Sequence, residues 1–361
     1  MTPMRLGILG LMLVLGASLA GVLPSSMAQA TDKPALGFAA KKPVFGGACP
    51  MCPWGNLGDV LKEAMKGTGW EIQMCHVCAG GPRSVRMVAG KQVPPINPES
   101  NTQPNPPQAP LDLGATGSER LWWAYEGMLT HTKEEDGGPH RDLRLIAHIE
   151  QPSFFMVAAR KGTGITDLRQ IRENRMAVKF MQVGIQSEGA NVNRLLDYYN
   201  LSEAVIEEEL GGDYVGTGPD NRENLDVVAG WVSLVRAPEY NYWMDVAHKY
   251  DFEFLQLPQP FMEEWARKGG YQVRNSPPGL LPGLENRSIL SVAKSGSAIY
   301  GRTDMPDDFA YAAAKAIDEN QHLLHWTHMN WFYNWRTVWK LFTVPLHPGA
   351  AKYYREVGYM K

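Results

Sequence analysis

The stretch VFGGACPMCPWGNLGDV (Val44–Val60) has the pattern of a buried strand that enters a glycine-rich turn and continues as a helix. Pro53 suits the first helical position, where the missing N–H has no hydrogen bond to lose. Apolar residues then recur at the spacing of a helix with one buried face, at Leu57, Val60, Leu61, Ala64 and Met65. The stretch therefore predicts a strand, a turn and a helix, with Cys49 and Cys52 in the turn.

The next segment repeats this order, since GWEIQMCHV reads as a strand, CAGG as a loop and PRSVRMVAG as a short helix. It carries a second pair of cysteines, Cys75 and Cys78. Successive strand–loop–helix units imply a parallel sheet, and the loops of such a sheet meet at the carboxyl ends of its strands, where ligands bind. If the two strands are neighbours, all four cysteines lie at that edge.

Similar units continue along the chain, in LDLGATGSERLWWAYEGML and again in RMAVKFMQVGIQSEGANVNRLLDYYNL. Between them, LRLIAHIEQPSFFMVAAR predicts two strand-like runs that are broken at Pro152. At 361 residues the chain suits two domains of ordinary size. The fold class expected from these patterns is α/β.

Composition excludes two kinds of partner. Hydrophobic residues make up 44% of the chain and charged residues 20%, which is an ordinary globular balance. The net charge of −3 provides no basic footprint for nucleic acid or for an anionic membrane surface.

The N-terminus has the pattern of a secretory signal peptide. Arg5 precedes eighteen residues without a charge, and these lead to the sequence AQA, which ends at Ala30. A positive start, an apolar middle and small residues at a cleavage site are typical of signal peptides, so we expect residues 1–30 to be removed. An uncleaved anchor helix is the alternative. An exported chain that starts near Thr31 would be periplasmic.

The four cysteines allow three interpretations. An oxidising compartment favours disulfides among Cys49, Cys52, Cys75 and Cys78. Two C-x-x-C pairs separated by twenty-two residues also resemble a zinc site, so a metal-binding protein that uses the same four residues is an alternative. A periplasmic dithiol oxidoreductase is another.

Residues 94–110 contain seven prolines and too few apolar residues to form a core, so we expect a solvated surface loop there. The sequence contains no G-x-S-x-G, no G-x-x-x-x-G-K-[ST] and no H-E-x-x-H. We therefore expect a protein that is not an enzyme and that has no cofactor.

Strand-to-helix turns with glycine and small polar residues favour anions, because the first N–H groups of a helix have no partner within it. Arg83 is a candidate counter-charge, and tryptophans beside two of the turns could form aromatic walls. The predicted ligand-binding residues are Cys52, Pro53, Trp54, Gly80, Gly81, Arg83, Gly117, Ser118, Gln186, Ser187, Glu188 and Trp231.

The C-terminal sequence MPDDFAYAAAKAIDEN…VPLHPGAAKYYREVGYMK resembles that of TAXI solute receptors, the extracytoplasmic binding subunits of one branch of the TRAP transporters. PLHPGAAKYYRE is the most specific match, and NLDVVAGWV resembles the strand and turn that close the ligand cleft in that family. The resemblance covers most of residues 35–361 and is weakest in the first hundred.

The resemblance implies a two-lobed periplasmic-binding-protein fold of type II. Lobe I would comprise residues 31–155 and 289–361, and lobe II residues 156–288. It also implies a small carboxylate as solute, delivery to a TRAP membrane permease and no catalysis. In the family the first turn runs into a Tyr-Tyr-Pro segment, whereas here Met51 and Cys52 stand at the tyrosine positions, so fold and role carry over better than the solute does.

Overall fold

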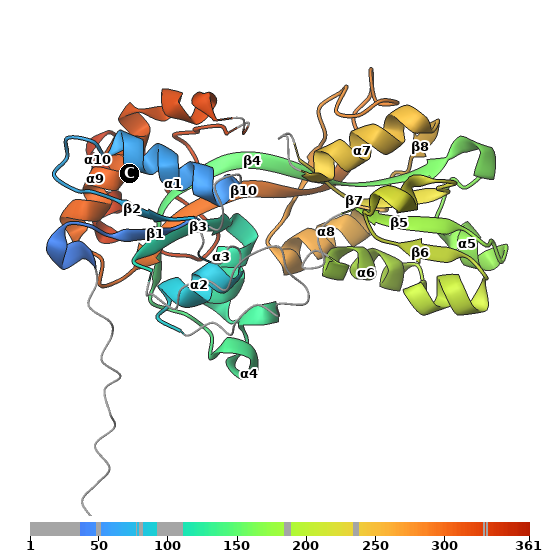
Figure 1. Cartoon of the computed structure of the whole chain (residues 1–361), viewed down its shortest axis with the longest axis horizontal. Coiled ribbons are helices and arrows are strands. Elements are labelled where there is room, and N and C mark those ends of the chain that lie inside the picture. The colour runs from blue at the N-terminus through green and yellow to red at the C-terminus, as the bar shows by residue number, and fades with distance from the viewer. Residues whose placement is uncertain are drawn as a thin grey trace, which may run out of the picture. The chain divides into compact units, whose positions relative to one another are not determined.

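The computed structural model describes residues 37–47, 52–76, 78, 82–91, 111–183, 189–233, 238–327, 329 and 331–361. Residues 34–361 form one compact unit, shown in Figure 1. The predicted signal peptide and the proline-rich segment 94–110 lie outside the described residues. Among the helices that are described, none is long and apolar enough to cross a bilayer.

The strands form a single ten-stranded sheet in the described part of the chain, in the order β2-β1-β3-β10-β4-β7-β5-β6, with β8 paired to β4 and β9 to β10. Their bounds are β1 Val44–Gly46, β2 Gln73–Cys75, β3 Leu113–Gly117, β4 Leu143–Arg160, β5 Lys179–Val183, β6 Asp213–Val215, β7 Val227–Ser233, β8 Phe252–Phe254, β9 Gln272–Asn275 and β10 Leu290–Arg302. Parallel pairs β1/β2, β1/β3, β5/β6 and β5/β7 are joined through antiparallel β4 and β10.

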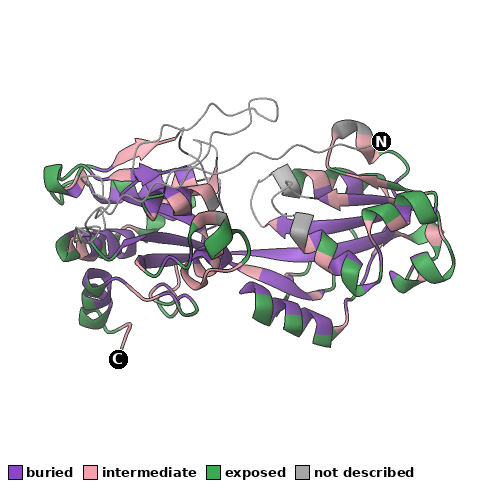
Figure 2. Cartoon of the chain, turned by 90° about the horizontal axis from the view of Figure 1, so that it is seen from below, coloured by how far each residue is buried: buried purple, intermediate pink, exposed green. Residues whose placement is uncertain are grey.

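Helices cover the sheet and turn their apolar sides toward it, as Figure 2 shows by burial. The α-helices are α1 Pro53–Ala64, α2 Pro82–Val88, α3 Ser118–Glu126, α4 Lys133–Asp136, α5 Arg169–Glu173, α6 Gly189–Tyr198, α7 Pro238–Lys249, α8 Gln259–Gly269, α9 Asp307–Glu319 and α10 Pro348–Glu356. Short turns of 3-10 helix include η1 Gly37–Ala40, η3 Leu129–His131 and η8 Gln321–Trp326.

Two separate sets of buried side chains share this sheet. We call the first core the side chains that pack around β1–β3 and the C-terminal helices, such as Phe45, Leu57 and Phe309. The second core packs around β5–β9 and includes Phe180 and Trp265. Two cores on one α/β sheet confirm the predicted fold class with two lobes.

The strands β4 and β10 each contribute to both cores. In β4, Ile149 is buried in the first core and Phe154 in the second. In β10, Ala298 is buried in the first core and Ala293 in the second. Figure 1 shows both strands running between the two groups of helices.

The expected break at Pro152 is wrong, because β4 continues through it from Leu143 to Arg160. The register of β4 against β10 shifts here instead, between the pairs Lys294/Ser153 and Gly296/Glu150. Proline lacks the N–H that a ladder needs, and a bulge accommodates this without ending the strand. Gly296 has φ +155°, and a Cβ atom there would lie 2.1 Å from the Ile149 carbonyl oxygen.

Candidate ligand-binding site

The starts of α1 and α3 lie at the same edge of the sheet. Strands β1 and β3 are parallel neighbours with Phe45 opposite Leu113, so the helices that follow them begin at the same edge. Pro53 is at the first position of α1 after Cys52, and Ser118 begins α3 after Gly117. The Cys52 side chain does not cap α1, and Gly117 has no side chain with which to cap α3. Both starts therefore favour a negatively charged group.

Arg120 connects these two helix starts. Its guanidinium lies 5.4 Å from the centroid of the Trp54 ring, so an arginine of α3 stacks on a tryptophan of α1. Arg120 is 7% exposed. A buried guanidinium next to helix starts adds positive charge where the peptide groups already favour an anion. Arg120 was absent from the predicted site, although its place two residues after Gly-Ser was visible in the sequence.

Several buried polar atoms at this edge have no hydrogen-bond partner among the described residues. They are Thr116 Oγ1, Ser118 Oγ, Glu119 Oε2 and Ser295 Oγ, and each residue is at most 5% exposed. Gly117 is paired with Ser297 of β10, two residues from Ser295, which places the start of α3 beside the β10 bulge. Buried polar groups are normally hydrogen-bonded, so a group of them at one place indicates a site for a polar ligand or for water.

Trp231 contributes an aromatic surface from the second core. It lies in β7 opposite Phe155 of β4 and is 2% exposed. Its ring lies 5.3 Å from that of Tyr271, and the Lys294 ammonium lies 4.4 Å from its centroid. Trp231 is therefore packed in the second core with a cation above its ring, and its contact with a solute stays a prediction.

The start of α6 is linked to the same aromatic group, because the Tyr271 hydroxyl donates to Asn191 Oδ1 in the first turn of α6 over 3.1 Å. Gln186, Ser187 and Glu188, which were predicted to precede this helix in the site, lie outside the described residues. Their role stays a prediction.

Arg83 lies in the first turn of α2 and is half-buried. Burial, with a contribution from nearby Arg86, lowers the pKa of Arg83 from its ordinary value. Gly80 and Gly81, predicted beside it, lie outside the described residues. The structure thus offers two arginines near the helix starts, of which Arg120 is the more deeply buried.

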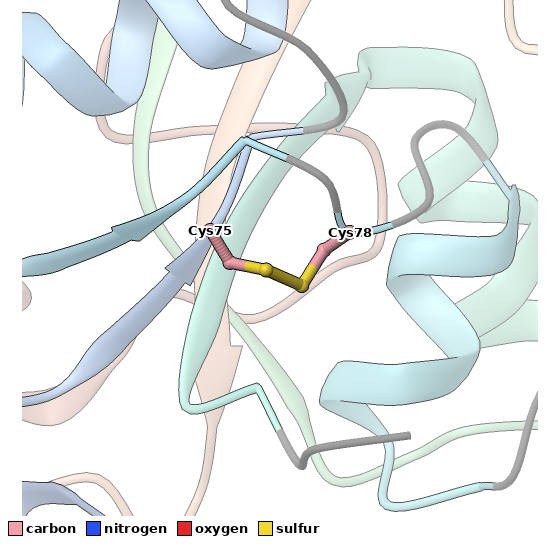
Figure 3. The surroundings of a disulfide bond; sticks show 2 residues. All are labelled: Cys75 and Cys78. Carbon is pink, nitrogen blue, oxygen red and sulfur yellow. A yellow bond between two sulfur atoms is a disulfide. The ribbon is translucent and has the colours of Figure 1, made fainter. Parts of the chain in front are cut away.

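A disulfide joins Cys75 and Cys78 within the second turn, as Figure 3 shows, with a separation of 5.4 Å between their Cα atoms. Cys52 is disulfide-bonded as well, and Cys49 lies outside the described residues. A sulfur in a disulfide is not the thiolate that binds zinc, so this arrangement favours disulfides over the metal alternative.

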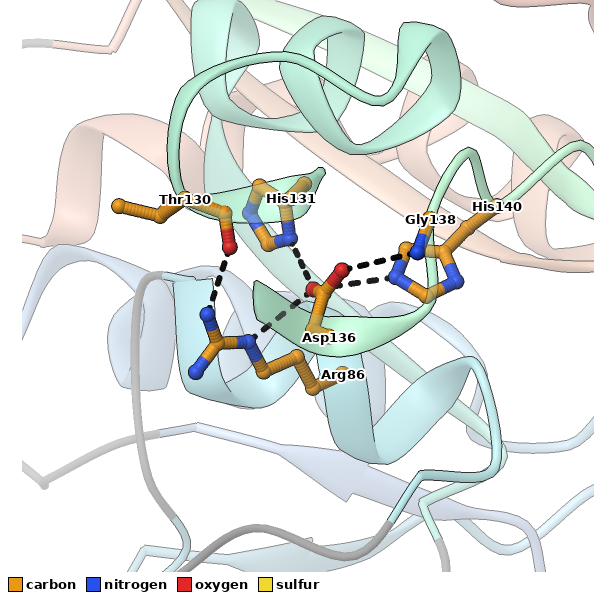
Figure 4. Close-up of polar contacts among 6 residues, drawn as sticks. All are labelled: Arg86, Thr130, His131, Asp136, Gly138 and His140. Atoms are coloured by element: carbon orange, nitrogen blue, oxygen red, sulfur yellow. Dashed lines mark hydrogen bonds and ion pairs between the residues drawn. The ribbon is translucent and has the colours of Figure 1, made fainter. Parts of the chain in front are cut away.

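One other group of side chains has the donor atoms of a metal site, among the residues that the structure describes. His131, Asp136 and His140 each offer an atom within 4.8 Å of the others. Figure 4 shows their contacts: His131 Nδ1 lies 2.6 Å and His140 Nε2 3.1 Å from Asp136 Oδ2. The Arg86 Nε–H donates to the same oxygen over 3.0 Å.

This cluster is better explained as a structural network than as a metal site. The guanidinium of Arg86 already balances the charge of Asp136, and a dication would be placed next to it. Burial lowers the pKa of His131 in spite of Asp136. Burial opposes ionisation of Asp136, but the bonds from His140 and His131 prevail and lower its pKa. The cluster fastens α2 to the η3–α4 segment, since Arg86 also donates to the Thr130 carbonyl.

The chain belongs to the NMT1-like family, whose model matches residues 110–358. The match begins just before β3 and extends through α10, so it includes Arg120, Trp231 and the strands β4 and β10 that both cores share.

Several solved structures are similar to the chain over much of its length. A TctC solute-binding protein from Polaromonas has 10% identity and a TM-score of 0.42, covering 88% of this chain and 98% of that one. A Xanthomonas citri protein bound to chloride ion has 12% identity and a TM-score of 0.41, covering 88% and 96%. ProX from Borrelia burgdorferi has 11% identity and a TM-score of 0.35, covering 78% and 95%. A shared ligand does not follow from similarity at this level.

Proposed function

We propose that this protein is an extracytoplasmic solute receptor that captures a small organic anion, a carboxylate, between its two cores. The two cores would be those of two lobes that move about β4 and β10 as hinges and close around the solute. The protein would act without catalysis and without a cofactor.

The observation that carries this proposal is the start of α3. There, an uncapped helix start, the buried Ser118 hydroxyl and the buried guanidinium of Arg120 lie within three residues. The helix N–H groups and the hydroxyl can donate to carboxylate oxygens, and the guanidinium supplies the balancing charge. Trp54 beneath Arg120 and Trp231 from the second core would form apolar walls.

The buried carboxylate of Glu119 narrows the class of solute. Its Oε2 has no hydrogen-bond partner among the described residues, and Glu119 is 2% exposed. A solute with a hydroxyl or ammonium group beside its carboxylate could donate to Glu119 while the carboxylate meets Arg120. We therefore propose a hydroxy- or amino-substituted carboxylate rather than a simple fatty acid.

The resemblance to TAXI receptors supports a place for the protein in transport. We propose that residues 1–30 export the chain to the periplasm and that a TRAP-type membrane permease accepts the solute from the closed receptor. The residues predicted at the first two turns would contribute to specificity beside the disulfide of Cys75 and Cys78, namely Cys52, Pro53, Trp54, Gly80, Gly81 and Arg83.

Mass spectrometry of small molecules released from protein that was purified from its native compartment would test the proposal. We expect a stoichiometric organic anion, and re-addition at a hundred times its Kd should stabilise the folded protein by about 2.7 kcal/mol. A screen of carboxylates by thermal shift provides an independent readout. If no anion is released and no carboxylate raises the melting temperature, the proposal is wrong. Stoichiometric zinc or copper on the purified protein would instead favour the metal alternative.

A further inference from the structure

Helix α3 carries two adjacent tryptophans, Trp122 and Trp123, that reach the end of α8 beside the second core. The Trp123 indole N–H donates to the Gly269 carbonyl oxygen over 3.0 Å. Its ring meets that of Tyr271 edge-on, with centroids 6.3 Å apart. Trp123 packs against the buried residues of the second core although its helix belongs to the first. It thus makes both a polar and an aromatic contact between the two.

Trp122 is held mainly by the first core. Its indole N–H donates to Thr343 Oγ1 over 3.1 Å, and its ring lies 5.2 Å from that of Phe342. It touches the α8–β9 turn at Gly270, where an added Cβ atom would lie 2.6 Å from Trp122 Cε3. Gly270 also has φ +69°, which favours glycine. The turn is therefore shaped to receive α3 closely.

These contacts differ in kind from the connection that β4 and β10 make between the cores. Strands β4 and β10 are continuous chain and join the cores in any arrangement. The Trp123 contacts are non-covalent and short-ranged, so they exist only in arrangements that bring α3 against Gly269 and Tyr271. A contact of this kind stabilises one arrangement relative to others.

The contact lies between the elements of the candidate site. Arg120 precedes Trp123 by three residues, so both lie on the same side of α3. Arg120 meets Trp54 of α1, while Tyr271 meets Trp231 and hydrogen-bonds Asn191 of α6. One helix face thus connects the start of α1 to that of α6.

We propose that Trp123 is a positioning residue that holds the two cores in the ligand-binding arrangement through Gly269 and Tyr271. This inference rests on the proposed receptor function only for the purpose of the Trp123 contact. The arrangement of the two cores can be measured without a ligand. The contact would keep α3 and Trp231 on opposite sides of the solute. The entropy cost of ordering the two cores on binding would then be smaller.

The test measures the distance between the cores in the full-length, oxidised protein. Spin labels at Glu319→Cys in α9 and Glu208→Cys, both exposed, report it by pulsed electron resonance. Trp123→Phe removes the N–H and keeps an aromatic ring, and Trp123→Ala removes both contacts. Thr343→Val is the matched control, because it removes the hydrogen bond that the Trp122 N–H donates within the first core and leaves the Trp122 ring at Gly270 unchanged.

Without any ligand, Trp123→Phe should raise the ratio of longer to shorter distances by roughly fivefold, as expected for loss of one hydrogen bond. Trp123→Ala should raise it further, while Thr343→Val should match the parent. If the distance distributions of both Trp123 variants superpose on that of the parent protein, the inference is wrong. Because no solute is added, this result is independent of whether an organic anion binds.

Discussion

At the scale of single residues, the proposed anion site depends on Arg120. We expect Arg120→Gln to weaken binding of the solute by about 10- to 100-fold, because a hydrogen bond to a charged group contributes about 1.5–3 kcal/mol. Calorimetric titration with the solute released from the native protein measures this. The guanidinium is buried on Trp54, so the loss should persist at high salt.

Arg141→Gln is the matched control for Arg120. Its guanidinium also lies over an aromatic ring, 4.5 Å from the centroid of Tyr125, and it pairs with Glu126. Its side chain is 52% exposed, however. We expect unchanged affinity in this variant. Equal losses in both variants, or none in Arg120→Gln, would remove Arg120 from the site.

His148 provides a pH-dependent prediction. Burial in β4 lowers its pKa from 6.5 to about 4, in spite of the nearby Glu150 carboxylate. The unfolded chain therefore takes up this proton more readily than the folded protein does. Its contribution to stability is complete above pH 6.5 and falls as the pH falls toward 4. At about pH 5 the loss should be about 2 kcal/mol.

Urea unfolding near neutral pH and at about pH 5 measures that loss. In His148→Leu the ring is replaced by an apolar group of similar size, so the variant should lose less stability between the two conditions than the parent. Other titrating groups are common to both proteins and cancel in the comparison. The same loss in parent and variant would contradict a depressed His148 pKa.

At the scale of elements, the attachment of α2 to the η3–α4 segment depends on Asp136. We expect Asp136→Ala to lower the free energy of unfolding by about 3 kcal/mol, because it leaves the Arg86 guanidinium without its buried counter-charge. The side chains of Asp136 and Arg86 are 3% and 19% exposed. Urea unfolding of both proteins at neutral pH gives the difference.

Asp251→Ala is the control for this element, since Asp251 pairs with Lys161 and the two side chains are 77% and 52% exposed. An exposed pair of this kind contributes about 0–1 kcal/mol. A comparable effect of both substitutions would show that the buried network does not fasten α2.

Helix starts were the elements that the sequence predicted best. Proline at the first position and glycine-rich turns marked α1, α2 and α3, because these signals depend on local backbone geometry. The contacts that build the site depend on which helices become neighbours. Arg120 on Trp54, and Tyr271 on Trp231, join residues far apart in the chain, and no spacing in the sequence indicates them. The continuation of β4 through Pro152 was missed for the same reason, since the bulge is set by its partner β10.

At the scale of the whole molecule, the two cores are tied together by shared strands. β4 and β10 are paired with each other from the first core into the second, with Ala298 opposite His148 and Ala293 opposite Phe154. If either core unfolded, β4 and β10 would each lose the packing around one of their ends. The α3 contacts at Gly269 and Tyr271 add to this connection.

We therefore expect residues 34–361 to unfold in one cooperative transition although they contain two cores. Tryptophans are buried in both, including Trp331 in the first and Trp265 in the second, so fluorescence follows both. Urea titrations followed by fluorescence and by far-ultraviolet circular dichroism should give coincident midpoints. Trp331→Phe and Trp265→Phe each remove one buried tryptophan from one core and so lower the share of the emission that comes from it, and their normalised curves should still agree with circular dichroism. Two resolved transitions in any of these proteins would show that the shared strands do not couple the cores, and that each core is stable by itself.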